Sequence, residues 1–409
     1  MLDLAVDRSG MLGWLGDYPR QLRALYPAGR RAGQDAAHGA GQDAARRAGQ
    51  SVARGAGVFS DVLVLGTGGG SGAAAHVAGS LVRPVLRVPF VVCQGYDPPG
   101  YASGGGDGEE GAAPPRRCGL ILAISHSGET EETLAAVERL AGCGGAGPTV
   151  SSAVVVISGG GRLTAQARQA GWPLVELPTG MQARAVFPGI LAAILGVLDG
   201  AALTATGFEA EIEEAATLAE GLAGSWGPAD RVSGAGGADR VSGVGGTDSG
   251  EPLTPLTLAG RVADRLLIIY GGAGATEGVA RRWKNQMAEN GKTLAHWYTV
   301  PEAHHDEVVG WDAPAAIREH LFACVLRDSA AEDPRMRKRL EVTTRLLAER
   351  VIGPERVVEV SALGRGRLAR AVSLCLFGDY LSCYVALLRG LDPTPVPIIV
   401  SLKEEMARG

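Results

Sequence analysis

Three hydroxyl side chains lie close together in the segment SHSGET, residues 125–130. Ser125, Ser127 and Thr130 follow the apolar run GLILAI and precede an amphipathic segment, so we expect them at a strand-to-helix turn. Backbone N–H groups at a helix N-terminus attract anions, and hydroxyls add further donors. The segment can therefore bind a phosphate without a lysine, although a capping turn would use the same residue types.

A second strand-to-helix turn, GTGGGSG at residues 66–72, is rich in glycine. Glycine here, at Gly69 for example, lets a ligand approach the backbone closely, and Ser71 can add a hydroxyl. The turn lacks the GK[ST] ending of a P-loop, and no acidic residue ends a second strand at the distance that a dinucleotide fingerprint requires. An anion site and a tight structural turn both remain open.

The third group of candidates lies in residues 280–311. On a helix, Arg282, Gln286 and Glu289 would share one face at i, i+4 and i+7. Farther along, the tetrad HHDE at residues 304–307 is polar between apolar neighbours. A carboxylate and a histidine near a phosphate site are the groups that general acid–base catalysis on a sugar phosphate needs.

A metal site is an alternative use of this segment, because His296, His304 and His305 lie near acidic residues. The HExxH spacing is absent, and adjacent histidines point in different directions. We therefore expect neither a metal nor a cofactor. An exposed polar loop without a chemical role is the remaining alternative.

Apolar strands that alternate with helices must position these groups. Such strands are expected within residues 61–72, 88–96, 119–124, 153–160 and 172–178, and again within 264–272, 320–328 and 356–362. Continuous apolar strands of this kind predict parallel sheets that are buried on both faces and bind ligands at their carboxyl ends. The expected fold class is α/β, with two doubly wound, flavodoxin-like domains in tandem.

Low-complexity segments separate and extend these domains. Near-duplicates occupy residues 33–48, with a period of eight, and 229–246, with a period of nine, and a glycine tract covers 103–113. We expect all three to be flexible insertions. The predicted segments are a helical N-terminal part at 1–57, a first domain at 58–201, a helical connection with a glycine-rich insertion at 202–251, and a second domain at 252–409.

Composition excludes several classes of protein. The 409 residues carry a net charge of −5 with both signs mixed, which argues against a nucleic-acid partner. No run of 18 apolar residues lacks a charge and the N-terminus does not resemble a signal peptide, so we expect a cytoplasmic protein without a membrane partner. Six cysteines without a CxxC pair indicate reduced thiols. Lysine is scarce, with only Lys284, Lys292, Lys338 and Lys403.

Five motifs together resemble the bifunctional phosphoglucose/phosphomannose isomerases, which are built from two sugar isomerase (SIS) domains. The resemblance runs from about residue 58 to the C-terminus, and the motifs occur in the order of that family. They are SHSGET at 125–130, GMQARAVFPGIL at 180–191, RRWKNQMAENGK at 281–292, PEAHHDEVVGW at 301–311 and DPTPVPIIVSLK at 392–403, whose part before Lys403 is expected to be extended.

The resemblance implies an aldose–ketose isomerase, an intramolecular oxidoreductase, that interconverts glucose 6-phosphate and mannose 6-phosphate with fructose 6-phosphate. Glu289 matches the base that moves a proton between C2 and C1 through a cis-enediol. His305 and Lys403 match the residues that open the sugar ring. Arg184 matches the arginine that stabilises the enediolate, where a fixed positive charge opposes developing negative charge.

The resemblance also implies how the substrate is held and how the chain assembles. The only small-molecule partner it implies is a sugar phosphate. The family delivers its histidine from the neighbouring subunit, so a homodimer with His305 crossing the interface is expected. The residues that match the phosphate-binding turns are Ser125, Ser127 and Thr130 and, approximately, Gly69 and Ser71.

Departures from the family pattern leave a second function open. The turn at 66–72 has an extra glycine, Glu129 replaces a common asparagine, and His304 and Asp306 replace the asparagines that flank the histidine. A non-catalytic SIS-domain protein that binds a sugar phosphate, or regulates through one, is the alternative. An NAD or nucleotide-sugar enzyme would need the missing acidic residue. The joint presence of Glu289 and its partners favours the enzyme, because a binder needs no base.

Overall fold

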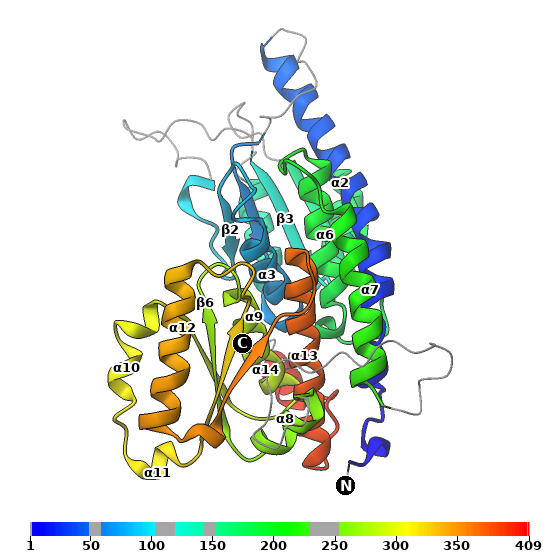
Figure 1. Cartoon of the computed structure of the whole chain (residues 1–409). Helices are drawn as coiled ribbons and strands as arrows, with labels where there is room; N and C mark the ends of the chain where they lie inside the picture. The colour runs from blue at the N-terminus through cyan, green and yellow to red at the C-terminus, as the bar shows by residue number, and fades with distance from the viewer. Residues whose placement is uncertain are drawn as a thin grey trace. The chain divides into compact units, whose positions relative to one another are not determined.

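The computed structural model describes residues 2–48, 59–102, 119–142, 153–228, 253–406 and 408, without the side chains of 43–48 and 141–142. The chain divides into two compact units. The first unit comprises Tyr18–Thr217 and Gly366–Ala369, and the second unit comprises Met1–Asp17, Leu218–Arg365 and Arg370–Gly409. The domain boundaries expected from the sequence remain a prediction. Two parallel sheets with helices confirm the α/β fold class (Figure 1).

The first unit contains a five-stranded parallel sheet in the order β2-β1-β3-β4-β5. Its apolar central strands are buried, as a sheet covered on both faces requires, and Val64 of β1 pairs with Leu122 of β3. The strand order reverses between β1 and β3. The elements are β1 Val62–Leu65, α3 Ala73–Val82, β2 Phe90–Cys93, β3 Leu120–Ser125, α4 Glu131–Gly142, β4 Ala153–Ser158, α5 Gly161–Ala170, β5 Leu174–Glu176 and α6 Phe187–Gly200.

Two helices of the first unit, α2 (Tyr18–Ala48) and α6, cross with their backbones in contact. A Cβ on Gly29 would lie 2.2 Å from the carbonyl oxygen of Ala193, and a Cβ on Gly33 would lie 2.2 Å from that of Val197. From the other side, a Cβ on Gly200 would lie 2.0 Å from Arg30 O. Only glycine fits at these positions.

The flexible insertion expected at residues 33–48 is wrong, because this segment forms the second half of α2. Ala36 and Ala40 are buried and Gly33 packs against α6, so small residues form a helix face here rather than a loop. Alanine, glutamine and arginine are also good helix formers. The segments expected at 103–113 and 229–246 lie outside the described residues.

The second unit contains a four-stranded parallel sheet in the order β7-β6-β8-β9, with the reversal between β6 and β8. Strand β7 was not predicted from the sequence, because AHWYTV mixes polar and aromatic residues as an edge strand can. The elements are α8 Pro255–Val262, β6 Leu266–Gly272, α9 Glu277–Glu289, β7 Ala295–Val300, α10 Glu307–Gly310, α11 Ala315–Arg318, β8 Leu321–Arg327, α12 Pro334–Leu346, β9 Val357–Ser361, α13 Arg367–Leu388 and α14 Pro397–Met406.

The C-terminal segment before Lys403 is helical from Pro397 and not extended as predicted. Proline suits the first turn of a helix, because its missing N–H would have no partner there. The remaining helices are the short α1 Met11–Leu15 and the long α7 Glu209–Trp226. The single turns are η1 Leu4–Val6, η2 Gly68–Gly72, η3 Gly100–Ala102, η4 Ala183–Ala185, η6 Glu302–His304, η7 Leu347–Val351 and η8 Pro354–Arg356.

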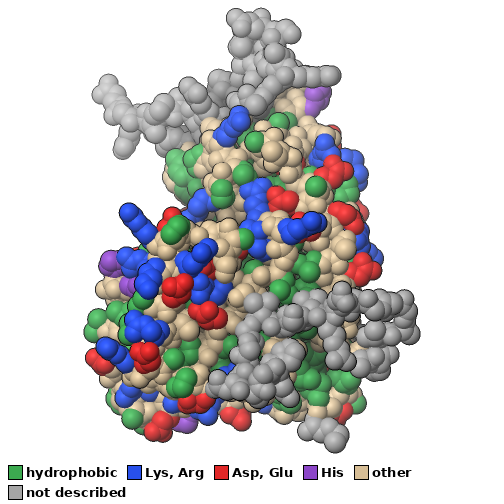
Figure 2. Space-filling model, viewed as in Figure 1, with side chains coloured by type: hydrophobic (Ala, Val, Ile, Leu, Met, Phe, Trp, Pro, Cys, Tyr) green, Lys and Arg blue, Asp and Glu red, His purple; other side chains and the backbone are tan. Residues whose placement is uncertain are grey.

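The charged surface and the buried apolar helices are those of a globular protein. On the face shown in Figure 2, acidic and basic side chains lie side by side. Of the described helices, α13 alone is long and apolar enough to cross a membrane, but 94% of its most apolar window is buried, as in a core helix.

The described cysteines, Cys93, Cys324, Cys375 and Cys383, are free thiols. Within the described residues no group of three His, Cys, Asp or Glu could hold a metal ion.

Candidate functional site

The carboxyl edge of the first sheet brings two candidate turns together. Leu65 at the end of β1 pairs with Ala123 of β3, so the turns that follow these strands, residues 66–72 and 125–130, begin side by side. The strand order reverses between these strands. Ligands of open α/β sheets bind at such reversal points.

The hydroxyl turn at residues 125–130 is ordered by its own backbone. The N–H groups of Gly128 and Thr130 donate to Ser125 Oγ over 3.0 and 3.4 Å, and this oxygen lies 2.7 Å from Thr130 Oγ1. The N–H of Glu129 donates to the exposed Ser127 over 3.2 Å. A hydroxyl that accepts a hydrogen bond keeps its own hydrogen to donate. The turn can therefore be both a helix cap and an anion site.

Glu129, the acidic residue in this turn, is paired with Arg162 at the start of α5. Its carboxylate accepts from the backbone N–H and from Nε of Arg162, both over 2.8 Å. These hydrogen bonds lower the pKa of Glu129. The carboxylate therefore stays ionised, but its charge is balanced from outside the turn.

The glycine turn η2 packs against η4, which carries Arg184. A Cβ on Gly70 would lie 2.6 Å from the carbonyl oxygen of Ala183, so this position requires glycine. Arg184 is 2% exposed, and its Nη1 donates to Gln182 Oε1 over 3.2 Å. Ser71 is also buried. The structure thus brings the predicted residues of η2 and Arg184 into one neighbourhood of the first unit.

Two polar residues beside this turn were not predicted from the sequence. A Cβ on Gly72 would lie 2.6 Å from Nε2 of Gln94, and Gln94 Oε1 lies 3.3 Å from Nε2 of His76. Gln94 directly follows β2. Its position just after a strand, at the edge where ligands bind, is the signal that could have identified it.

In the second unit, Glu289 is the last residue of α9 and is partly exposed. Its expected companions on the helix face are buried instead. Arg282 is fully buried and its Nη2 lies 2.6 Å from Oδ2 of Asp379, and Gln286 is 1% exposed. The three residues share one face of α9 as expected, but only Glu289 is partly exposed. The helix face packs into the unit, and the carboxylate at its end remains accessible.

The adjacent histidines have different surroundings. His304 Nε2 lies 2.8 Å from Thr343 Oγ1, and Arg339 Nη1 lies 3.0 Å from His304 Nδ1. Burial, and then the charge of Arg339, lower the pKa of His304. His305 is exposed. Of the pair, His304 is thus held within its own unit and His305 faces solvent.

Glu289 and His305 lie toward opposite ends of the second sheet. β6 and β7 are parallel and α9 joins them, so α9 ends at the edge where β7 begins, whereas His305 follows the far end of β7. The six residues of β7 correspond to about 20 Å. Lys403 lies on α14, and the segment before α14 contacts the Glu289 end, because Lys292 Nζ donates to the carbonyl oxygens of both Glu289 and Pro393.

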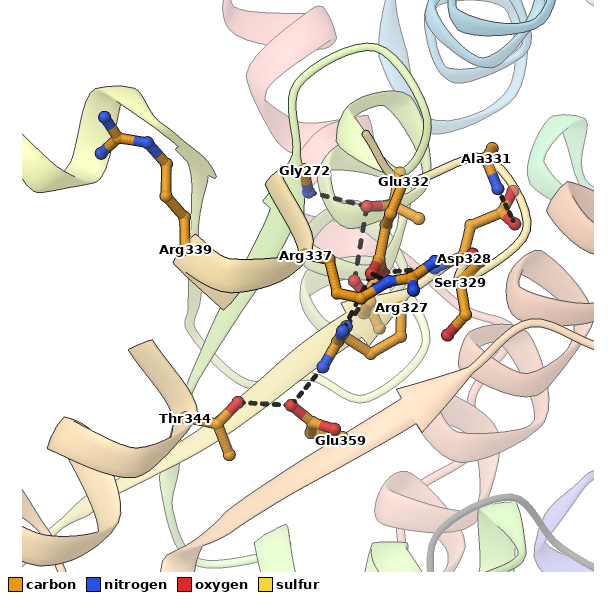
Figure 3. Close-up of polar contacts among 12 residues, drawn as sticks. Gly272, Arg327, Asp328, Ser329, Ala331, Glu332, Arg337, Arg339, Thr344 and Glu359 are labelled. Atoms are coloured by element: carbon orange, nitrogen blue, oxygen red, sulfur yellow. Dashed lines mark hydrogen bonds and ion pairs between the residues drawn. The ribbon is translucent and has the colours of Figure 1, made fainter. Parts of the chain in front are cut away.

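A cluster of paired charges lies around the carboxyl end of β8 in the second sheet (Figure 3). Arg327, the last residue of β8, donates to Glu332 from Nε and Nη2 over 2.9 and 2.8 Å and to Glu359 from Nη1 over 2.6 Å. The next residue, Asp328, accepts from Arg370 Nε over 2.7 Å. The hydrogen bonds that Arg327 donates to Glu332 raise the pKa of Arg327. Arg327 and Arg370 are therefore each paired with a carboxylate.

Two parallel sheets with strand-end turns of this kind form a two-unit α/β protein, and solved structures share this fold. A solved structure, that of hypothetical protein TT0462 from Thermus thermophilus, shares the fold with a TM-score of 0.64 and 16% identity, over 98% of this chain and 91% of that chain. Residues 254–406 match the family described as bacterial phospho-glucose isomerase C-terminal SIS domain.

Sequence relatives specify the family further. The bifunctional phosphoglucose/phosphomannose isomerase of Caldicellulosiruptor bescii is 29% identical over 347 residues, which cover 85% of this chain and 90% of that protein. The protein of the same name from Aquifex aeolicus is 28% identical over 291 residues, 71% of this chain and 76% of that protein. Over most of its length the chain is thus similar in sequence to bifunctional phosphoglucose/phosphomannose isomerases.

Proposed function

We propose that this protein is an aldose–ketose isomerase that interconverts glucose 6-phosphate and mannose 6-phosphate with fructose 6-phosphate. The observation that carries the proposal is the accessible Glu289 at the end of a helix face whose other polar groups are buried. A protein that only binds a sugar phosphate needs no such base. The names of the relatives support the same substrates.

In this proposal the first unit binds the phosphate. The hydroxyl of Ser127 donates to a phosphate oxygen, and the Ser125–Thr130 pair, which uses one hydrogen between its two hydroxyls, donates the other. The N-terminus of α4 adds a favourable dipole. Gly69 and Ser71 of η2 add backbone and hydroxyl donors. Since Glu129 is paired with Arg162, its charge opposes the phosphate less than a free carboxylate would.

The proposed chemistry needs one carboxylate and one fixed cation. Glu289 removes the proton from C2 of the open-chain aldose and returns it to C1 through a cis-enediol. Arg184 stabilises the enediolate, and its burial supports this role because a guanidinium stabilises developing charge more strongly away from water. The proton moves within the substrate, so the reaction needs no external oxidant.

Ring opening is assigned to His305 and Lys403, which shuttle a proton between the ring oxygen and O1. Within one chain, His305 and Glu289 are separated along β7, whereas the segment before Lys403 contacts the Glu289 end. This separation supports a homodimer in which His305 of a second copy completes the site. The exposure of His305 supports the same assembly.

The direct test is the purified protein with fructose 6-phosphate, with glucose 6-phosphate and mannose 6-phosphate measured as products. We expect turnover by the parent protein and a kcat about 10²- to 10⁴-fold lower in Glu289→Gln, because the amide cannot take a proton. Lys338→Met, on the exposed face of α12, is the control and should match the parent. An inactive parent that still binds the sugar phosphate would instead identify a non-catalytic binder.

Mixing two inactive variants tests the shared site. Glu289→Gln and His305→Asn each disable every site in their own homodimers. Mixed dimers contain one site with both native residues, so an equimolar mixture should regain about a quarter of the parent activity. A mixture that stays inactive after subunit exchange, confirmed by mass spectrometry, would argue against His305 from a second copy.

A further inference from the structure

Lys292 lies three residues beyond Glu289 and contacts two distant parts of the second unit. Its ammonium donates to the carbonyl oxygen of Glu289 over 2.5 Å, to that of Pro393 over 3.1 Å and to that of Pro395 over 2.5 Å. Its backbone has the left-handed φ of +51°, which is uncommon for a residue other than glycine. The side chain thus joins the end of α9 to the segment that leads into α14.

Arg389 joins the same two segments, but it lies in the second segment and donates to the first. Nη1 of Arg389 donates to the carbonyl oxygens of Gly291 and Lys292, each over 3.2 Å. Pro393, which Lys292 contacts, and the next residue, Thr394, are buried. Residues 289–292 and 389–395 therefore form one hydrogen-bonded junction.

The helix beyond this junction has little else to fix it. α14 contains no buried residue, and Ile398 is 78% exposed and Leu402 59% exposed. Burial of apolar surface normally fixes the position of a helix in a domain. The start of α14, and with it Lys403, must therefore be located mainly by the segment that Lys292 holds.

We propose that Lys292 is a positioning residue that keeps the end of α9 bearing Glu289 and the segment leading to Lys403 in one fixed arrangement. This inference rests on the proposed function, which assigns proton transfer to these two residues. An ordinary helix cap would contact only the last turn of α9. The bonds to Pro393 and Pro395, about a hundred residues away in sequence, couple two elements.

The chemistry of lysine suits this junction. An ammonium has three N–H donors on a single atom, and here three carbonyl oxygens converge on it. Its charge also interacts favourably with the C-terminus of a helix. An arginine carries the same charge, but its planar fork spreads its donors apart and cannot meet three converging acceptors in this way.

The experiment compares Lys292→Met, Lys292→Gln and Lys292→Arg with the parent, with Lys338→Met as the lysine control. Hydrogen exchange is measured on peptides that cover 389–406. Kinetics are measured with glucose 6-phosphate and with its C2-deuterated form. Misplacing a reacting group by about 1 Å can cost about 10²-fold, so we expect kcat to fall roughly 10- to 100-fold in all three variants with a smaller change in KM.

A purely structural role would not change the isotope effect. We expect a larger isotope effect on kcat in the Lys292 variants, because proton transfer to a displaced Glu289 becomes slower relative to other steps. Exchange in 389–406 should also be faster than in the parent. Full activity in Lys292→Arg would overturn the inference, since it would show that charge at the helix end is sufficient.

The two proposals can fail separately. An inactive parent overturns the proposed function, and hydrogen exchange then still tests the junction: faster exchange in Lys292→Met supports it and unchanged exchange overturns it. With an active parent, unchanged kcat in a folded Lys292→Met overturns the positioning role. If Lys292→Met does not fold, as judged by its thermal transition, Lys292→Gln retains an uncharged donor and decides the same question.

Discussion

The carboxyl edges of the two sheets differ although both sheets reverse strand order at the corresponding place, between β1 and β3 and between β6 and β8. The first edge has a glycine turn and hydroxyls that retain donors. The second edge has Arg327 enclosed by Glu332 and Glu359 (Figure 3). The fold is repeated, but the chemistry of the binding edge is not, because the site depends on particular side chains rather than on topology.

The turn after β6 is held by hydrogen bonds of Thr276 to the backbone of the second unit. Thr276 Oγ1 accepts from the N–H of Gly272 over 2.8 Å and donates to Leu326 O over 3.5 Å. A Cβ on Gly271 would lie 2.8 Å from the carbonyl oxygen of Thr276, so the turn folds back on its own strand. The hydroxyl of Thr276 is thus used by the backbone both as acceptor and as donor.

The largest effect, on the free energy of unfolding, is expected when the buried ion pair of Arg327 and Glu332 is broken. Arg327→Met leaves Glu332, whose side chain is 2% exposed, without its main partner. Breaking a buried ion pair costs about 3–5 kcal/mol, so the free energy of unfolding should fall by about that amount. Denaturant unfolding followed by circular dichroism measures it. If Arg327 instead bound substrate, KM would rise while the unfolding free energy stayed near that of the parent.

A matched pair of hydroxyl deletions sharpens the comparison. If Ser125 binds the phosphate as proposed, Ser125→Ala should raise KM about tenfold or more, because hydrogen bonds to charged groups contribute about 1.5–3 kcal/mol. It should also lower stability, because the N–H groups of Gly128 and Thr130 lose their acceptor. Thr276→Ala should lower stability by about 1–3 kcal/mol, because it leaves the N–H of Gly272 without its acceptor, and should not change KM. Equal KM values in the two variants would remove the distinction between the edges.

The smallest expected effect is a change of thermal stability with pH that arises from His296 in the second unit. A hydrogen bond to Glu307 raises the pKa of His296. The resulting stabilisation is fully present below the unfolded pKa of about 6.5 and is lost as pH rises through the folded pKa. The thermal transition of the parent should therefore fall, relative to that of His296→Asn, as pH increases above about 6.5. Parallel pH curves for the two proteins would contradict the ion pair.

Alternating apolar strands and helices were sufficient to predict the first sheet with its two strand-end turns and three of the four strands of the second sheet. The repeat at 33–48 was mistaken for a loop because composition does not show that Gly33 lies against the backbone of α6. β7 was missed because an edge strand need not be continuously apolar. In each case the deciding contact is with a part of the chain that is distant in sequence.

The residues of the candidate site also divide into those that local sequence predicts and those that depend on distant contacts. The position of Ser125 and Thr130 at a strand end follows from local pattern, and the structure agrees. The burial of Arg282 against Asp379 depends on a residue 97 positions away, and the bonds of Lys292 to Pro393 and Pro395 depend on a segment equally remote. Local spacing predicts which groups are available, and tertiary contacts decide which of them a substrate can reach.

The near-duplicated segment of α2 has a consequence for how this chain could have lengthened. Eight residues extend a helix by about 12 Å and turn it by about 80° beyond two full turns. The first copy places Ala36 and Ala40 against the unit, and the copy after it starts on a different side of the helix axis. A duplicated loop would leave its neighbours unchanged, whereas this duplication adds a rod that runs past the end of α6 (Figure 1). Growth of this kind lengthens one helix by about two turns for each added copy.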